Sequence, residues 1–195
     1  MARKAKIIKV GLDFDGVVAY NPFRIIRAPI KWFKREILGI KKLTFFVPKN
    51  WWQKIVWALL HESSLFPARG IELLTLLVND RQIEVHLITA RFGFLTENLE
   101  KWLERNKIKH LFKTININHN CEQPHIYKEK ILDKLKPDVY VEDNLDIVLH
   151  LSQKLKNKTK IFWIYNILDA KKKYPFKYPY LEKALKKIIN NENSV

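Results

Sequence analysis

The stretch Val10–Val18, which reads VGLDFDGVV, decides how the rest of the chain is interpreted. Apolar strand formers lead into it from Ile7, and the run stops at Asp13 and Asp15, with Gly16 directly behind them. Such a run predicts a buried parallel strand, and the glycine lets the backbone turn sharply where that strand ends. Because ligands of open α/β sheets bind beyond the carboxyl ends of strands, both carboxylates are expected where such sheets perform chemistry.

Two carboxylates separated by one residue repel each other unless a cation or a proton compensates. We therefore predict that Asp13 is a nucleophile, that Asp15 is an acid/base, and that Mg2+ supplies the compensating charge. The alternative is an ordinary surface turn, because Asp and Gly are common turn residues. The strand ends further along the chain decide between the two interpretations.

The composition is that of a globular protein with one main domain. The chain has 195 residues, 47% of them hydrophobic, which is enough to bury a core and to fold. Its single cysteine, Cys121, excludes an internal disulfide and fits a reducing compartment. We find no apolar run of about 18 residues and no signal peptide before the first strand, so we expect a cytoplasmic protein without a transmembrane segment.

The formal net charge of +16 has two interpretations. The first is attraction to anions, namely phosphates, nucleotides, nucleic acid or an acidic membrane surface. The second, which we favour for the chain as a whole, is compositional drift, because Lys, Ile and Asn are abundant while Gly is scarce. Charge alone therefore selects no partner.

Alternating strand and helix patterns predict an α/β fold, with a Rossmann-like parallel sheet covered by helices on both faces. After the first strand, the expected strands are Ile83–Thr89, Lys113–Asn118, Asp138–Val141 and Lys160–Tyr165. The expected helices between them cover residues 68–79, 94–106, 126–135 and 145–155. A basic stretch, Lys171–Tyr180, is expected to be irregular, and a final helix begins near Leu181.

Residues 20–65 differ from the rest and are predicted to form a small helical cap inserted after the first strand. This division leaves residues 1–19 and 66–195 as the α/β core domain. Within the cap, Pro29 suits the first turn of a helix and Gly39 suits its end.

A second cap helix is expected from Asn50, where Gln53 completes a capping box. Its apolar stripe consists of Trp52, Ile55, Val56, Leu59 and Leu60. The aromatic side chains of the cap stand among many Lys and Arg residues. They either stack a base and attract phosphate, or they form the core of the cap itself.

The second predicted strand ends in Thr89, followed by Ala90 and Arg91. A hydroxyl and the amides that open the next helix would together cradle a phosphate. Arg91 is expected to reach the phosphate or the remote part of the substrate. The alternative for Thr89 is a simple helix cap.

Lys128 starts the inward stripe of its helix, because Ile131, Leu132 and Leu135 follow it at helical spacing. An inward lysine near strand ends suits holding a phosphate and balancing carboxylates. The alternative is that the side chain extends along the surface to reach solvent.

The fourth strand ends in Glu142 and Asp143, which supply the hard oxygen ligands that Mg2+ prefers. The alternative is that Asp143 or Asn144 caps the following helix.

In chain order, these elements read strand–DxDG, strand–Thr, helix–Lys and strand–Glu-Asp. With LDFDGVV, LITAR, Lys128 and VYVEDN as its four motifs, nearly the whole chain resembles the haloacid dehalogenase-like (HAD) superfamily. The resemblance implies that Asp13 attacks phosphorus to form an aspartyl-phosphate. Asp15 would protonate the leaving oxygen and then activate water. Thr89 and Lys128 would bind the phosphoryl oxygens.

The resemblance also implies Mg2+ held by Asp13, the main-chain carbonyl of Asp15 and Asp143, with Glu142 nearby or bound through water. An acid at Asp15 favours phosphoryl transfer, because the relatives that remove halide lack one there. Within the superfamily, the chain looks most like the 5'(3')-deoxyribonucleotidase group. The expected activity is therefore hydrolysis of a small phosphorylated substrate, such as a nucleoside monophosphate.

Two alternatives stay open. The first is a protein that binds nucleic acid or an anionic surface on the same fold with little turnover, and a phosphatase acting on nucleic-acid ends lies between the two. The second is a phosphomutase, which would share the catalytic residues.

Overall fold

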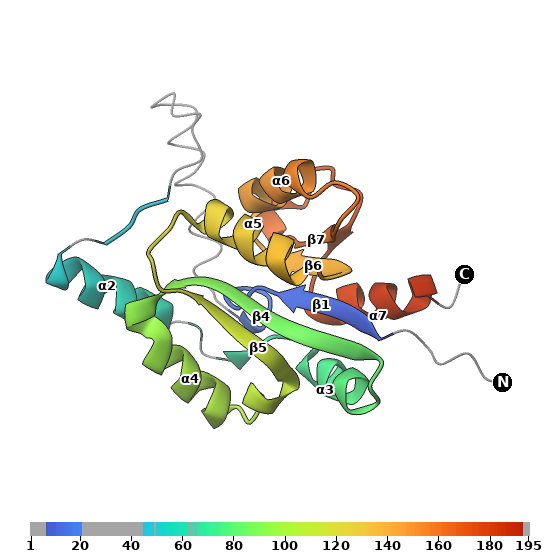
Figure 1. Cartoon of the computed structure of the whole chain (residues 1–195), viewed down its shortest axis with the longest axis horizontal. Coiled ribbons are helices and arrows are strands. Elements are labelled where there is room, and N and C mark those ends of the chain that lie inside the picture. Colours follow the sequence, from blue (N-terminus) through green and yellow to red (C-terminus); the bar gives the residue numbers. More distant parts are fainter. Residues whose placement is uncertain (1–6, 21–44, 49, 63, 65, 193–195) are drawn as a thin grey trace.

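The computed structural model describes residues 7–20, 45–48, 50–62, 64 and 66–192. Its centre is a sheet of six parallel strands in the order β5-β4-β1-β6-β7-β8 (Figure 1). The strands are β1 (Ile8–Leu12), β4 (Ile83–Phe92), β5 (Phe112–Asn118), β6 (Val139–Glu142), β7 (Lys160–Ile164) and β8 (Lys177–Tyr178). This topology confirms the predicted Rossmann-like α/β fold.

Helices cover both faces of the sheet, as the alternating pattern predicted. On one face lie α3 (Ile71–Asn79), α4 (Thr96–Arg105) and α7 (Leu181–Glu192). On the other face lie α5 (Pro124–Leu135) and α6 (Leu145–Lys154). Each layer buries its own apolar cluster against the sheet, so β1 is enclosed from both sides.

The central place of β1 determines where the aspartates lie. Leu12, the last residue of β1, is opposite Leu87 of β4 and Val141 of β6. The next residue, Asp13, donates its backbone N–H to the carbonyl of Val141 at 3.0 Å. The ends of β1, β4 and β6 therefore lie side by side, and residues that follow any of the three strands share one edge of the sheet.

The predicted end of β4 at Thr89 is wrong, whereas the helix predicted over residues 94–106 is confirmed, because α4 occupies most of that range. The strand continues to Phe92, with an irregular register between Thr89 and Phe92. A short 3-10 helix (Gly93–Leu95) then precedes α4. The buried ring of Phe92 and its pairing with Asn118 account for the extension, because both are tertiary contacts that local periodicity does not encode.

The basic stretch 171–180 is not wholly irregular, because β8 pairs with β7. Phe176 and Tyr178 pack on Phe162, with ring centroids 5.4 and 4.9 Å apart respectively. These aromatic rings therefore belong to the fold rather than to an exposed binding surface.

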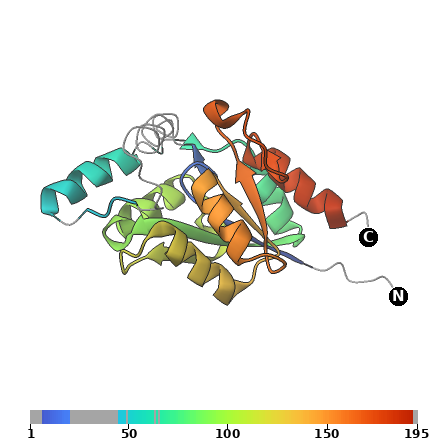
Figure 2. The ribbon, with the colours of Figure 1, turned by 90° about the horizontal axis from the view of Figure 1, so that it is seen from above.

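Helix α2 (Trp51–Glu62) is the described helix of the insert, and it extends away from the body of the sheet (Figure 2). The backbone N–H of Asn50 donates to Gln53 Oε1 at 3.2 Å, which confirms the predicted capping contact. The predicted apolar stripe does not face the core, however, because Trp52, Ile55, Val56 and Leu59 are each about half exposed or more. The opposite side faces the core instead, where Trp57 packs against Phe92 with centroids 6.3 Å apart.

Two short strands bracket the insert. β2 (Ala19–Tyr20) and β3 (Phe66–Pro67) pair antiparallel at the two positions where the sequence places the domain boundaries. The helix expected between Pro29 and Gly39 lies outside the described residues, so the extent of the cap stays a prediction. None of the helices in the described ranges has the length and hydropathy needed to cross a membrane.

Candidate active site

A tight turn follows β1 and carries both aspartates. The carbonyl of Phe14 accepts hydrogen bonds from the N–H groups of Val18 and Ala19 at 3.1 and 2.9 Å. Gly16 has φ of 89°, the left-handed region that glycine adopts without steric cost. Asp13 and Asp15 are only 5% and 8% exposed, so the alternative of a solvated surface turn does not hold.

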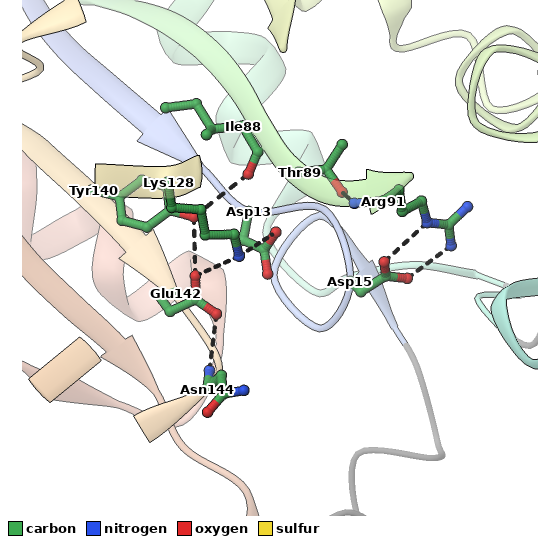
Figure 3. Close-up of polar contacts among 9 residues, drawn as sticks. All are labelled: Asp13, Asp15, Ile88, Thr89, Arg91, Lys128, Tyr140, Glu142 and Asn144. Carbon is green, nitrogen blue, oxygen red and sulfur yellow. Dashed lines mark hydrogen bonds and ion pairs between the residues drawn. The ribbon is translucent and has the colours of Figure 1, made fainter. Parts of the chain in front are cut away.

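Lys128, from the first turns of α5, reaches the first of these carboxylates. Its ammonium group lies 3.0 Å from Asp13 Oδ1 and 2.7 Å from Glu142 Oε2 (Figure 3). The side chain is 2% exposed, which excludes the alternative in which it extends to solvent. A buried ammonium thus bridges a carboxylate after β1 and a carboxylate at the end of β6.

Glu142 is fully buried, and its oxygens are engaged by the protein. Oε2 accepts from Lys128 at 2.7 Å and from the Tyr140 hydroxyl at 3.0 Å. Oε1 accepts from the backbone N–H of Asn144 at 3.0 Å. The side chain of Asn144, not that of Asp143, caps α6. Glu142 therefore orients Lys128, and Asp143 is not consumed by helix capping.

The carboxylates of Asp13, Glu142 and Asp143 form one acidic group, with ligand oxygens within 4.8 Å of one another. Burial raises the pKa of Asp13 well above its usual range, and the charge of Glu142 raises it further, while Lys128 opposes both. Burial alone would lower the pKa of Lys128. The negative charges of Asp13 and Glu142 have the larger effect, so the pKa of Lys128 lies above its ordinary value.

This donor set fits Mg2+. Among the described residues, Lys128 is the cation in contact with Asp13 and Glu142, and the three carboxylates together offer the hard oxygen ligands that Mg2+ prefers. Because three protein donors already engage Glu142, Asp13 and Asp143 are the side chains best suited to direct coordination. Glu142 then acts as a neighbouring counter-charge.

Asp15 faces a different set of groups. Its oxygens accept from Arg91 Nε at 2.9 Å, from Arg91 Nη2 at 2.7 Å and from the Ser64 hydroxyl at 2.8 Å. Arg91, which the sequence predicts to contact phosphate, thus has its guanidinium on Asp15. Sequence reasoning did not identify Ser64, because two adjacent serines at the end of an insert match no motif.

Thr89 and Ala90 lie at the same edge of the sheet, on the strand next to β1. Thr89 is 1% exposed, and its hydroxyl accepts the backbone N–H of Arg91 at 3.2 Å. Since no helix begins here, any phosphate contact from this segment comes from the irregular end of β4 rather than from a helix N-terminus.

A scan against protein-family models finds no match for this chain, and a search of curated proteins finds no significant similarity. Solved structures do match. The HAD-hydrolase YfnB from Bacillus subtilis, bound to magnesium, aligns with TM-score 0.56 and 13% identity over 95% of this chain and 99% of that chain. A Thermotoga maritima protein assigned as a β-phosphoglucomutase aligns with TM-score 0.58 and 14% identity over 94% of this chain and 99% of that chain.

CbbY from Rhodobacter sphaeroides, in complex with phosphate, aligns with TM-score 0.54 and 11% identity over 91% of this chain and 96% of that chain. At such low identity, these similarities describe architecture. Together with the six-stranded parallel sheet and the acidic edge, they identify the fold of this chain as that of the haloacid dehalogenase-like hydrolases.

Proposed function

We propose that this protein is a Mg2+-dependent phosphomonoester hydrolase that works through an aspartyl-phosphate on Asp13. One observation carries the proposal: the buried Asp13 carboxylate contacts the Lys128 ammonium and lies among the acidic group that includes Asp143, at the edge of the sheet beyond β1. A nucleophile, a fixed cation and oxygen ligands for a metal are the parts that phosphoryl transfer requires.

In the first step, an Asp13 oxygen forms a bond to phosphorus as the bond from phosphorus to the leaving oxygen breaks. Asp15 gives its proton to that oxygen, and the alcohol leaves. In the second step, Asp15 takes a proton from water, whose oxygen attacks phosphorus and releases phosphate from Asp13. Lys128 favours the ionised form of Asp13 throughout. Asp13 and Asp143 would hold Mg2+, which would supply positive charge to offset that of the phosphoryl oxygens.

The substrate class within this proposal is a small phosphomonoester, and the narrower proposal is a nucleoside monophosphate. Support for a flat, apolar group comes from a row of aromatic rings next to the end of β4. Phe46 packs on Trp57, Trp57 on Phe92, and Phe92 on Phe94. Phe46 and Phe94 are 52% and 39% exposed, so ring surface remains accessible in this row.

The test is phosphate release from 5'- and 3'-nucleoside monophosphates, sugar phosphates and an aryl phosphate, with Mg2+ or with chelator. Asp13→Asn should reduce release at least about 1000-fold, because the nucleophile is lost. Asp133→Asn, on the exposed side of α5, is the control and should leave release unchanged. Equal release by the Asp13→Asn variant and the parent protein would rule out the proposal.

The same panel separates a phosphatase from a phosphomutase, the activity assigned to the Thermotoga maritima neighbour. A mutase would return an isomer of a sugar phosphate with little free phosphate. A phosphatase releases phosphate in the same amount as alcohol.

A further inference from the structure

A second buried cluster surrounds Asp15, on the other side of Asp13 from Glu142 (Figure 3). Arg91 presents two nitrogens to it, Nε to Oδ2 at 2.9 Å and Nη2 to Oδ1 at 2.7 Å. This paired geometry is the strongest arrangement available to an arginine and a carboxylate. Arg91 is 4% exposed, so solvent weakens the pair very little.

The guanidinium of Arg91 also contacts an aromatic ring. It lies over the ring of Phe14, 4.5 Å from the centroid, and Phe14 is the fully buried residue between the two aspartates. The ring of Trp102, from α4, meets Phe14 edge-on with centroids 4.9 Å apart. Arg91 therefore lies between the ring of Phe14 and the carboxylate of Asp15, and a change in its position would disturb both.

Ser64 completes the cluster. Its hydroxyl donates to Asp15 Oδ1 at 2.8 Å and accepts from Arg91 Nη2 at 3.3 Å. Its backbone carbonyl accepts from Trp102 Nε1 at 2.5 Å. Ser64 is 1% exposed and lies where the insert returns to the core, just before β3. The contacts thus form a closed ring through the turn after β1, the end of β4, helix α4 and the insert.

We propose that Arg91 and Ser64 are positioning residues for Asp15, and that Arg91 acts on this acid/base rather than on the phosphoryl group. We call Arg91, Ser64, Phe14 and Trp102 the Asp15 seat. The inference rests on the proposed function, because Asp15 needs a fixed position only if it transfers a proton. Ser64 lies at the end of the insert, just before β3, and its hydroxyl contacts Asp15. The position of Asp15 therefore depends on the insert.

The first experiment compares leaving groups, using Arg91→Lys and Ser64→Ala on an alkyl phosphate and on 2,4-dinitrophenyl phosphate with Mg2+. An activated aryl oxide leaves without protonation, whereas an alkoxide needs the acid. If the seat positions Asp15, kcat/KM, which reports transfer of the phosphoryl group from the ester to Asp13, falls at least tenfold more for the alkyl ester than for the aryl ester. KM and inhibition by inorganic phosphate should stay within about threefold of the parent, because phosphate contacts are intact.

A rise in KM and in the inhibition constant of phosphate, with equal losses of kcat on both esters, would overturn the proposal in favour of a phosphate ligand. Equal losses of kcat/KM on the two esters, with inhibition by phosphate unchanged, would reduce the seat to a structural role. The control is Arg69→Met, which removes an arginine paired with Glu182 on the surface and should leave both esters unaffected.

The second experiment needs no turnover. Thermal unfolding of the parent, Arg91→Met, Asp15→Asn and the double variant is measured in chelator. If Arg91 and Asp15 stabilise each other, removing both should lower the melting temperature by several degrees less than the sum of the two single-variant shifts. Additive shifts would contradict the seat. If the parent hydrolyses no ester, the proposed function fails on its own, and this cycle still decides whether the pair exists.

Discussion

Asp13 and Asp15 are two residues apart and almost equally buried, yet the charges around them differ. Further carboxylates surround Asp13, whereas an arginine pairs with Asp15. Asp13 faces β6, where Glu142 and Asp143 add two further carboxylates and Lys128 contacts Asp13 and Glu142. Asp15 faces β4 and the insert, where a guanidinium and a hydroxyl satisfy it. Asp13 is left with a repulsion that a bound metal cation can relieve, whereas Asp15 is held in place by its donors.

The largest effect should come from Lys128, the single cation within contact distance of the acidic group among the described residues. Lys128→Met leaves Asp13 and Glu142 buried without their partner, and breaking such a pair costs about 3–5 kcal/mol. Chemical denaturation in chelator measures the loss in free energy of unfolding. Lys130→Met, two residues along α5 and paired with Glu122 at the surface, is the control and should cost at most about 1 kcal/mol. Equal losses would show that Lys128 does not compensate the acidic group.

Next, neutralising the two aspartates should change stability in opposite directions. Asp15→Asn leaves Arg91 buried with a weaker acceptor and should lower the free energy of unfolding by about 2–3 kcal/mol. Asp13→Asn removes one of three mutually repelling carboxylates and, in chelator, should leave stability unchanged or raise it by about 1 kcal/mol. Denaturation of the two variants side by side measures the difference. Losses of the same size would remove the contrast between the two sites.

The dependence of stability on pH provides the third test. Burial and the charge of Glu142 raise the pKa of Asp13 above its ordinary value of 3.8, so in this window the native state binds more protons than the unfolded state. Stability in chelator should therefore fall as pH rises from about 4 through the raised pKa of Asp13. Mg2+ binds the ionised carboxylate and should reverse that fall, and Asp13→Asn should flatten it. If stability falls equally with rising pH in the Asp13→Asn variant, the pH dependence comes from other groups.

The sequence predicted the parts of this site that depend on strand position. Asp13 and Glu142 end buried strands, and the parallel register of β1 with β6 brings them together. Lys128 begins the inward stripe of α5, and helical spacing was sufficient to place it inside. These residues therefore meet where the order of motifs predicts, while their roles stay predictions until phosphate release is measured.

The Asp15 seat was not predictable in the same way. A charge in a sequence indicates a sign but not a partner, so Arg91 was assigned to phosphate rather than to Asp15. Ser64 reaches Asp15 across 49 positions of sequence, through an insert whose path no periodicity encodes. The exposure of the α2 stripe was not predictable for a related reason. An amphipathic pattern shows that a helix has an apolar side, but not what that side contacts.

The smallest predicted effect tests whether Glu142 needs its second donor. Tyr140→Phe removes the hydroxyl that donates to Glu142 Oε2 at 3.0 Å and should cost about 1 kcal/mol of stability, a typical value for one hydrogen bond. Tyr174→Phe, which removes a part-buried hydroxyl that donates to the Ile161 carbonyl and contacts the Ser152 hydroxyl, should cost a similar amount. Only Tyr140→Phe should also slow phosphate release, by about threefold to tenfold, because Glu142 then orients Lys128 less firmly. Equal turnover in the two variants would show that Lys128 and Asn144 alone fix Glu142.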